Sequence, residues 1–422
     1  MTLILVSDFM QDEIYLNEEV KYYKSIDRPI LFTVRGHVYS NSRMDIPDNF
    51  EIGKLDIQYK SNLNRLKHLF KGVFNKLTFN DFNYLLKNNK LSYNSFKSLM
   101  LFAAKSSLVY DNMINRMKSL GIEDYEEITL YSYRVGFSTL ALCKLKKRYK
   151  NAKIISRAHA QDIFEFRNKE NYLPFRQYLY ENIDEICCIS LDGMNYLNDN
   201  YEVLKNKTSL YRLGTRNIPL NENVNNSDFT IITCSRVARI KRLDLLAKSL
   251  LHIDEQISWV HYGDGDTAYY EEIKGIIDKY NSNINVDFVG FCDNKNYLDI
   301  ISKSNLSVFI NVSESEGLPV SIMEAESVGL PIIATDVGGT SEAVIDGLNG
   351  FLVNKDITEE DLAKKILEMK NMSKDKYDKM RYNSRKVWEE KFDLSNNYSD
   401  FVNHLWNKLI WLLGYKLLYK GT

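Results

Sequence analysis

The sequence predicts an α/β protein built from two doubly wound domains, and three observations support this. The chain has 422 residues, more than one hydrophobic core usually organises. Short apolar segments with strand character alternate along it with helical patterns. A polar, Asn-rich segment at residues 217–228 divides this alternation into two sets. We therefore expect an N-terminal domain over 1–216, a linker over 217–228 and a C-terminal domain over 229–394.

Each set contains short apolar runs that predict the strands of a sheet. In the first domain we expect strands at residues 3–6, 30–34, 128–131, 153–156, 185–189 and 210–213. In the second we expect them at residues 230–235, 259–262, 287–289, 306–310 and 332–334. A C-terminal helix at about 395–422 is predicted to complete the first domain. Ligands of such sheets bind outside the carboxyl ends of the strands, so two facing sheets predict a site in a deep cleft between domains.

Composition is ordinary for a globular protein and excludes several classes of function. Hydrophobic residues make up 44% and charged residues 26% of the chain, and the net charge of −1 predicts no nucleic-acid partner. The five cysteines form no Cys-x-x-Cys pair, which predicts reduced thiols. The N-terminus lacks a charged segment and a cleavage site, and no run approaches 18 apolar residues. We expect a cytoplasmic protein.

The run Ser313-Glu-Ser-Glu316-Gly-Leu-Pro319-Val-Ser-Ile-Met-Glu324 places two carboxylates around a glycine and a proline. Pro319 suits the first turn of a helix, and Gly317 allows close approach of the backbone to a ligand. The helix N-terminus would carry roughly +0.5 elementary charge and free N–H groups, which suit a phosphate. A carboxylate further along could hold hydroxyls such as a ribose diol. Two solvated surface acids are the alternative.

A second cluster opens the C-terminal domain, where a predicted strand ends at Ser235 and delivers Arg236 and then Lys241. Arginine offers a planar donor fork and lysine a compact point charge, and this pair suits a diphosphate. The alternative is a solvated basic turn, because Arg239 and Arg242 lie in the same stretch.

Residues 313–353 resemble the donor-binding signature of the retaining family 4 glycosyltransferases (glycosyl transferases group 1) of the GT-B fold. The pattern is Ser-x-x-Glu-Gly-x-Pro, four residues, and Glu-Ala, followed by a Gly-x-Pro strand, a Gly-Gly loop at 338–339 with a following Glu342, and an Asp-Gly-x-x-Gly turn from Asp346. The resemblance implies two Rossmann-like domains, and transfer of a hexosyl unit from a UDP- or GDP-sugar to an acceptor hydroxyl. It also implies that no metal or other cofactor is needed.

The resemblance also implies a role for each residue of the motifs. Arg236 and Lys241 would hold the diphosphate, Glu324 the ribose hydroxyls, and Glu316 the sugar hydroxyls near the reacting carbon. Arg239 and Arg242 match nothing in the family and are expected at the surface. The remaining donor contacts that it implies are Gly317, Leu318, Pro319, Gly263 of a Gly-Asp-Gly turn, and Gly290 and Phe291 beside the nucleobase.

In the N-terminal domain, Arg157-Ala-His159-Ala-Gln-Asp162 resembles a motif of sugar transferases that build bacterial surface polysaccharides. That resemblance implies that His159 contacts the donor sugar across the cleft, with Asp162 orienting it or contacting the acceptor. A structural histidine is the alternative. The Gly-Gly loop of many relatives is replaced by residues 7–13, where Asp12 is either an acceptor contact or part of a solvated helix start.

Residues 54–118 contain twelve basic and three acidic residues, a balance of +9. Two interpretations stay open: contact with an anionic membrane surface, or a core-facing helix with a solvated basic face. The aromatic, Lys-flanked segment 406–420 would likewise dock on the first domain or touch lipid. The apolar residues that interleave with the charges at helical spacing are Leu63, Leu66, Leu69, Phe70, Val73, Phe74 and Leu77.

The predicted function is therefore a retaining glycosyltransferase acting on a glycan or lipid-linked glycan acceptor, in surface polysaccharide or glycolipid synthesis. Its expected location is the cytoplasm, with peripheral attachment to the inner face of the cell membrane through residues 54–118. Two alternatives share the fold. A nucleotide-sugar 2-epimerase would need several acid/base groups, and only His159 is evident. A non-catalytic partner subunit would usually have lost Arg236, Lys241 or Glu316, and all three are present.

Overall fold

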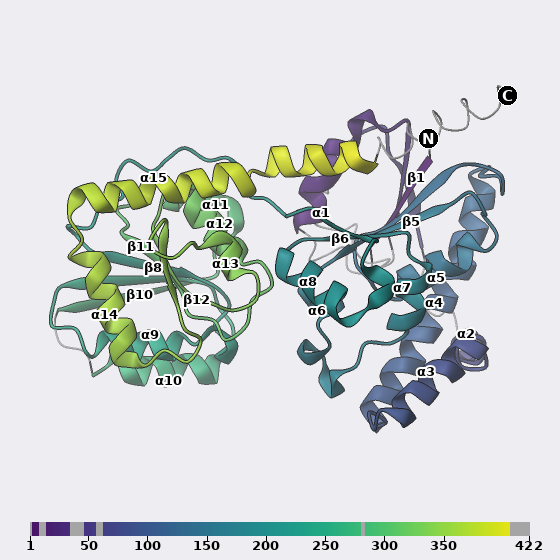
Figure 1. Cartoon of the computed structure of the whole chain (residues 1–422), viewed down its shortest axis with the longest axis horizontal. Coiled ribbons are helices and arrows are strands. Elements are labelled where there is room, and N and C mark those ends of the chain that lie inside the picture. The colour runs from purple at the N-terminus through teal and green to yellow at the C-terminus, as the bar shows by residue number, and fades with distance from the viewer. Residues whose placement is uncertain (1, 8–13, 34–45, 56–61, 280–282, 406–422) are drawn as a thin grey trace. The chain divides into compact units, whose positions relative to one another are not determined.

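The computed structural model describes residues 2–7, 14–33, 46–55, 62–279 and 283–405. The chain forms two compact units (Figure 1). The described residues up to Tyr211, together with those from Tyr398 on, make the first unit, and Arg212–Asn397 make the second. The segment predicted as a linker, 217–228, instead belongs to the second unit. Its Asn221 is buried and donates to the carbonyls of Ile301 and Ser304, both at 2.7 Å, so it satisfies a helix end rather than water.

The first unit is built on a seven-stranded sheet in which all neighbouring strands are parallel. Its order is β3-β2-β1-β4-β5-β6-β7. Alternate residues of β1 enter different core layers, Ile4 and Val6 on one face and Leu3 and Leu5 on the other, because both faces of a parallel sheet are covered. The strands are β1 (Thr2–Ser7), β2 (Arg28–Thr33), β3 (Glu51–Lys54), β4 (Ile128–Ser132), β5 (Lys153–Ala158), β6 (Glu185–Cys188) and β7 (Thr208–Leu210).

Helices cover both faces of this sheet. One core layer receives α4 and α5, and the other receives α1 and the helical run over residues 394–405. The helices are α1 (Ile14–Glu19), α2 (Asn62–Val73), α3 (Lys76–Lys87), α4 (Tyr93–Ser119), α5 (Phe137–Lys146), α6 (Ala160–Ile163), α7 (Arg176–Asn182) and α8 (Leu191–Asn200), with 3-10 turns at Val20–Ser25, Glu165–Arg167, Lys169–Asn171 and Glu202–Leu204.

The second unit holds a six-stranded parallel sheet in the order β10-β9-β8-β11-β12-β13. Its strands are β8 (Thr230–Cys234), β9 (Ile257–Tyr262), β10 (Ile284–Gly290), β11 (Val308–Asn311), β12 (Ile332–Thr335) and β13 (Gly350–Val353). Its helices are α9 (Leu243–Leu250), α10 (Thr267–Ile277), α11 (Asn294–Ile301), α12 (Val320–Ser327), α13 (Thr340–Ala343), α14 (Glu359–Lys370) and α15 (Lys374–Lys391), with a 3-10 turn at Arg239–Lys241.

The strand order locates the ligand crevice of each unit. In the first unit the order reverses between β1 and β4, and in the second between β8 and β11. Ligands of doubly wound sheets bind outside the carboxyl ends of the strands at such a reversal. The Arg236–Lys241 stretch follows β8 and the Glu316–Glu324 stretch follows β11, so both motifs of the second unit start at its reversal point.

The predicted α/β class with two doubly wound domains is confirmed. Every predicted strand overlaps an observed one, although the run at 210–213 is strand only at Leu210. Two strands were missed. Glu51–Lys54 offers a single large apolar residue, and Gly350–Val353 directly follows the predicted Asp-Gly-x-x-Gly turn and starts at its last glycine. The five cysteines are free thiols, as expected. None of the described helices combines the length and apolar character needed to cross a membrane.

A buried ion pair links distant parts of the first unit. Arg157 of β5 and Glu19 of α1 approach to 2.9 Å, and both side chains are fully buried. The hydroxyl of Tyr131 donates to Glu19 at 2.9 Å, and that of Tyr23 at 2.7 Å. On its other side the Arg157 guanidinium lies 4.2 Å from the ring centroid of Phe401. The arginine of the Arg-Ala-His motif is therefore part of the core.

Candidate functional site

The central contact of the second unit joins its two motifs. Lys241 follows β8 and Glu316 follows β11, and Lys241 Nζ lies 2.6 Å from Glu316 Oε1. Asn311, the last residue of β11, donates its amide to the same oxygen at 3.2 Å. The Glu316 side chain is only 12% exposed. Two donors thus fix one carboxylate oxygen, and a carboxylate placed in this way can accept hydrogen bonds from further hydroxyls.

Arg242 holds the loop that carries Lys241. Its Nε donates to the carbonyl of Val312 and its guanidinium to that of Lys355, both at 2.7 Å. Its backbone adopts a left-handed φ of 48°, which is uncommon outside glycine. The expectation that Arg242 is a free surface residue is therefore wrong. It fastens the 3-10 turn to the carboxyl end of β11, and this positions Lys241 beside Glu316.

The other two arginines of this stretch are exposed. Arg239 is exposed and pairs with Glu272 at 2.7 Å, as expected for a surface residue. Arg236, at the end of β8, is also exposed, and its guanidinium forms no ion pair with any residue that the structure describes. Its planar donor fork is therefore accessible to a ligand.

The Gly-Gly loop packs against the backbone that carries Glu316. Gly339 N–H donates to the carbonyl of Gly317 at 2.7 Å. Gly338 has a φ of 55°, and a Cβ placed there would lie 2.0 Å from the carbonyl oxygen of Glu316. Gly317 is not among the described glycines with positive φ. Gly338, rather than Gly317, is thus the position where this loop requires glycine.

We expect Gly338→Ala to distort the Glu316 loop. The left-handed backbone alone costs about 1–2 kcal/mol with a Cβ, and the contact with Glu316 O adds to that. Gly347→Ala is the matched control, since Gly347 has a φ of 72° and a Cβ added there would meet no other atom within 4 Å. Urea unfolding and transfer activity should show a larger stability loss for Gly338→Ala, and an activity loss for it alone. Equal behaviour of the two variants would contradict this arrangement.

The helix after the first motif begins one residue later than its sequence suggests. Pro319 is the N-cap, and α12 starts at Val320. Leu318 is buried in the core of the second unit, so it anchors the loop. Glu324, in the second turn of α12, is 6% exposed. Its Oε1 accepts a 2.6 Å hydrogen bond from Asn294 of α11. Burial raises the pKa of Glu324 to about 7, although the hydrogen bond from Asn294 acts to lower this pKa.

This pKa predicts a pH-dependent stability difference. The pKa of this carboxyl is higher in the folded protein than its unfolded value of about 4.5, so the protonated carboxyl favours folding. This stabilisation is complete below pH 4.5 and is lost as pH rises through 7. At 1.36 kcal/mol per unit, the loss between pH 4.5 and 8.5 is about 3 kcal/mol. Glu324→Gln, which cannot ionise, should gain about that much relative to the wild type in urea unfolding over this range. A constant difference would show that Glu324 titrates normally.

The predicted nucleobase side is built from glycines. Gly263 N–H donates to the carbonyl of Gly290 at 2.8 Å, which joins the ends of β9 and β10. A Cβ on Gly263 would lie 1.9 Å from the carbonyl of Ser235, so only glycine allows this approach. Phe291 follows with its ring 75% exposed. A concavity of about 230 Å³ lies at these strand ends, lined by residues that include Val237, Gly263, Asp264, Gly265, Tyr270 and Gly290.

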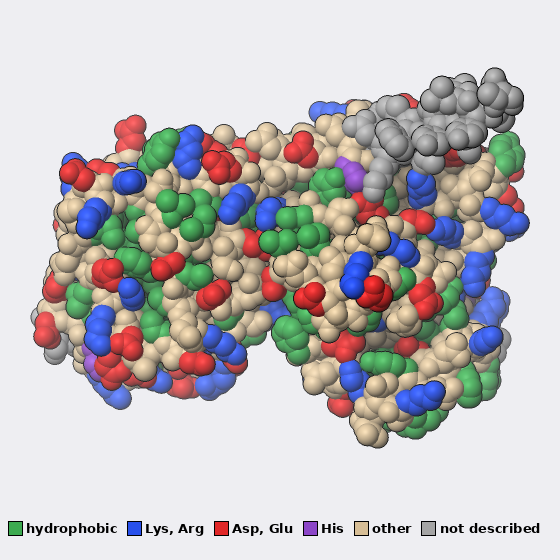
Figure 2. Space-filling view, viewed as in Figure 1, with side chains coloured by type: hydrophobic (Ala, Val, Ile, Leu, Met, Phe, Trp, Pro, Cys, Tyr) green, Lys and Arg blue, Asp and Glu red, His purple; other side chains and the backbone are tan. Residues whose placement is uncertain are grey.

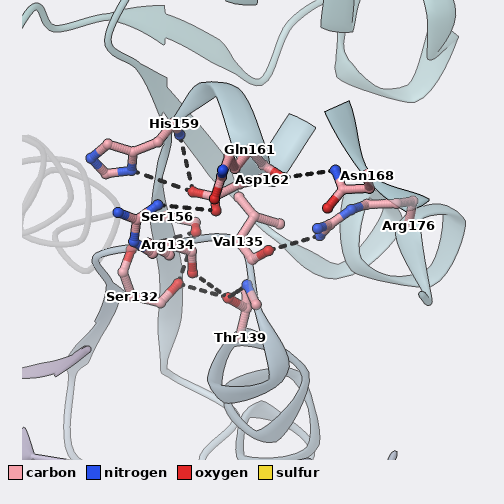
Figure 3. Close-up of polar contacts among 11 residues, drawn as sticks. Ser132, Arg134, Val135, Thr139, Ser156, His159, Gln161, Asp162, Asn168 and Arg176 are labelled. Carbon is pink, nitrogen blue, oxygen red and sulfur yellow. Dashed lines mark hydrogen bonds and ion pairs between the residues drawn. The ribbon is translucent and has the colours of Figure 1, made fainter. Parts of the chain in front are cut away.

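In the first unit, His159 and Asp162 form a local cluster with Arg134 (Figure 3). His159 directly follows β5 and is the N-cap of α6, and its Nδ1 lies 3.3 Å from Asp162 Oδ2. Arg134 donates to the other Asp162 oxygen at 3.4 Å. Asp162 is buried and turned toward His159, so it is placed to orient the imidazole. His159 Nε2 is buried without a partner among the described residues.

The charges of this cluster favour a neutral imidazole beside a carboxylate. Burial lowers the pKa of His159, and the hydrogen bond with Asp162 only partly opposes this. Burial would raise the pKa of Asp162, but the hydrogen bond from His159 and the charge of Arg134 lower it overall. With Nδ1–H donating to Asp162, Nε2 of a neutral ring is an acceptor.

Hydroxyl groups below the cluster fix the strand ends that carry it (Figure 3). Ser132 Oγ lies 2.8 Å from Ser156 Oγ and 3.0 Å from Thr139 Oγ1, which joins β4, β5 and α5. The Arg176 guanidinium donates to the carbonyl of Val135 at 2.9 Å. These contacts keep the carboxyl ends of β4 and β5 in register.

Three polar partners were missed in the sequence: Asn294, Asn311 and Arg134. Asn311 and Arg134 both lie where a strand ends, and this placement was the only available signal. The predicted acceptor-side residue Asp12 lies outside the described residues.

Potential metal ligands do not gather at either cluster. Among the described residues, the one group of three with suitable spacing is Glu185, Cys187 and His404 in the first unit. There His404 Nε2 and Glu185 Oε1 lie 2.9 Å apart, as a hydrogen-bonded pair. The candidate site of the second unit offers cationic side chains instead, which suit anionic groups directly.

Comparison with known proteins agrees with this geometry. Residues 215–387 match the family model described as "Glycosyl transferases group 1". Among curated proteins, an uncharacterized glycosyltransferase of Methanocaldococcus jannaschii is 27% identical over 321 residues, which cover 76% of this chain and 85% of that protein.

Solved structures share the fold over nearly the whole chain. Sucrose-phosphate synthase from Thermosynechococcus elongatus has a TM-score of 0.70 at 16% identity, covering 97% of this chain and 99% of that one. Anabaena HepE in complex with UDP has a TM-score of 0.68 at 13% identity, with 96% and 100% covered. The lipopolysaccharide outer core galactosyltransferase WaaB has a TM-score of 0.64 at 14% identity, with 97% and 100% covered.

Proposed function

We propose that the chain is a GT-B glycosyltransferase of the glycosyl transferases group 1, and that it transfers a hexosyl residue from a UDP- or GDP-sugar with retention of configuration. The acceptor in this proposal is a hydroxyl of a glycan or lipid-linked glycan. The single observation that carries the proposal is the Lys241–Glu316 contact at the point where the strand order reverses. It sets a cation for the diphosphate next to a carboxylate for sugar hydroxyls.

In the proposed reaction, bond cleavage leaves negative charge on the nucleoside diphosphate. Arg236 and Lys241 would neutralise it, with the N-terminus of α12 adding its dipole. Each charge-assisted hydrogen bond contributes about 1.5–3 kcal/mol. Since these groups supply the positive charge, the proposal assigns no metal or other cofactor to the protein. That HepE was solved in complex with UDP supports a uridine nucleotide as one candidate donor.

The carboxylates take different roles in this proposal. Glu324 would accept hydrogen bonds from the ribose hydroxyls, with Asn294 holding it, while Gly290 and Phe291 lie on the nucleobase side. Glu316 would accept hydrogen bonds from the donor sugar. Its pairing with Lys241 lowers the nucleophilicity of the Glu316 carboxylate. This suits a group that accepts hydrogen bonds from sugar hydroxyls and does not attack the sugar. In the first unit, His159 would contact the sugar through Nε2, oriented by Asp162.

The proposed setting is surface polysaccharide or glycolipid synthesis. The Arg157-Ala-His159 motif supports it, and so does the fold shared with WaaB, which is named as a lipopolysaccharide galactosyltransferase. We place the protein in the cytoplasm, with residues 54–118 toward the inner face of the cell membrane.

A panel of UDP- and GDP-sugars tests the proposal. We expect one donor to release its nucleotide slowly in water and faster with a glycan acceptor, and the product anomer, read by NMR, should match the donor. Conversion of the donor to a 2-epimer without acceptor would identify the epimerase alternative. Binding without turnover under all acceptor conditions would support a non-catalytic subunit.

A further inference from the structure

The turn between α2 and α3 exposes an unusual number of large apolar side chains. Leu66 and Phe70 on α2 are 50% and 59% exposed, Phe74 in the turn 76%, and Phe79 on α3 62%. The rings of Phe70 and Phe74 stack with their centroids 5.3 Å apart. We name these four exposed side chains the α2–α3 corner. Globular proteins rarely leave several large apolar side chains exposed in one short segment without a partner.

The packing of α2 shows that these side chains do not face the core. His68 lies 3.3 Å from Ser107 of α4, and a Cβ on Gly72 would lie 2.7 Å from the backbone of Ala103. Positions 68 and 72 therefore face α4. Phe70 lies two residues from each, which is about 200° around the helix. For the corner, the interpretation of a core-facing apolar stripe is wrong.

Lysines surround the corner. Lys67, Lys71 and Lys76 are exposed on α2 and at the start of α3, and Figure 2 shows basic and hydrophobic side chains interspersed over the part of the first unit where these helices lie. Lys71 pairs with Asp111 at 2.7 Å. Lys67 and Lys76 form no ion pair with a described residue. The surface thus offers apolar rings together with unneutralised positive charge.

We propose that the α2–α3 corner docks on an anionic lipid bilayer. Phe70, Phe74 and Phe79 enter the boundary between headgroups and acyl chains, while Lys67 and Lys76 bind the phosphates of the headgroups. Charge complementarity favours a bilayer over a protein surface. Exposed aromatic side chains with Lys67 and Lys76 nearby in the sequence match an anionic headgroup layer above an apolar interior. This docking rests on the membrane setting proposed above for residues 54–118, but not on the transfer reaction, so it can fail while the proposed reaction holds.

Vesicle flotation of the full-length chain tests whether the apolar side chains of the α2–α3 corner enter the bilayer. We expect binding to phosphatidylcholine vesicles containing phosphatidylglycerol, and little binding to pure phosphatidylcholine. Phe70→Ser combined with Phe74→Ser should weaken the partition coefficient at least tenfold. Tyr125→Ser is the matched control, because Tyr125 is as exposed as Phe74 but lies in a loop before β4. It should bind like the wild type.

The double variant Lys67→Glu with Lys76→Glu tests whether these lysines bind the phosphates of the headgroups. A lysine near an anionic surface contributes about fivefold in affinity, so loss of both lysines, with added repulsion from two carboxylates, should weaken binding at least about 25-fold at low salt. The control is Lys376→Glu combined with Lys379→Glu, which makes the same charge change on exposed positions of α15. All four variants should keep the wild-type circular dichroism and melting temperature.

Three results would overturn the proposal. They are equal binding to charged and uncharged vesicles, undiminished binding of the Phe70/Phe74 variant, and a wild-type dimer in light scattering that this variant converts to a monomer. The last result would assign the corner to contact between copies of this chain. As a further readout, a tryptophan at position 74 (Phe74→Trp) should be quenched by brominated lipids in anionic vesicles only.

Discussion

Replacing Glu316 with Ala should abolish transfer while the fold stays intact. The carboxylate is held by Lys241 and Asn311 at the carboxyl end of β11, where the proposed sugar hydroxyls would meet it. Loss of a preorganised group of this kind typically lowers the rate about 10²–10³-fold, and here Lys241 also loses its partner. We expect kcat/KM to fall about 10³-fold or more. Steady-state release of UDP or GDP, with the melting temperature measured in parallel, checks this.

Glu314→Ala is the control in the same loop. Its side chain is 57% exposed and lies 3.7 Å from Lys355, so it should keep normal activity and stability. Glu316→Gln keeps the shape without the charge and should be nearly as inactive as Glu316→Ala. Near-normal turnover of either Glu316 variant, or insoluble protein, would argue against the assignment of Glu316 to the donor sugar.

Arg157→Ala should strongly destabilise the first unit. The change leaves Glu19 fully buried without its counter-ion, and breaking one partner of a buried pair costs about 3–5 kcal/mol. Burial already raises the pKa of Glu19, against the charge of Arg157, so the unpaired carboxyl would fold in its protonated form. Urea unfolding followed by circular dichroism should show an earlier transition for the first unit.

The double replacement Glu19→Leu with Arg157→Met separates charge from packing. Because apolar residues of similar volume can replace a buried ion pair at little cost, we expect it to recover much of the stability lost in Arg157→Ala. Arg148→Ala, which breaks an exposed pair with Asp124, is the control and should leave unfolding nearly unchanged. A double variant as unstable as Arg157→Ala would show that the tyrosine hydroxyls around Glu19 dominate.

The proximity of Lys241 and Glu316 could be predicted from the sequence because both residues come after predicted strands of one sheet. Lys241 and Glu316 lie 75 positions apart, yet each comes just after an apolar run. Parallel strands share one carboxyl edge, so their loops had to meet. Asn311 and Asn294 carried no comparable signal. An isolated asparagine is common in loops and helix starts, and only the packing of its neighbours shows which carboxylate it reaches.

Two errors have a common cause, because the sequence analysis assigned to solvent two polar residues that satisfy backbone groups. Arg242 and Asn221 both donate to carbonyls that would otherwise lack partners. On α2 the sequence left two interpretations open, and the structure exposes Phe70 and Phe74, whose apolar spacing had allowed a core-facing helix. Helical periodicity identifies an apolar face of α2. The contacts of His68 and Gly72 show which face packs against α4.

The contact between Arg157 and Phe401 also constrains the order in which the protein can be made. During synthesis, α1 and β5 leave the ribosome long before residues 401–405, which complete the same core layer. The first unit therefore stays incomplete on that face until residues 401–405 have been synthesised, while the second unit can finish its sheet earlier. A prematurely terminated chain would expose that unfinished layer and become a substrate for chaperones and proteases.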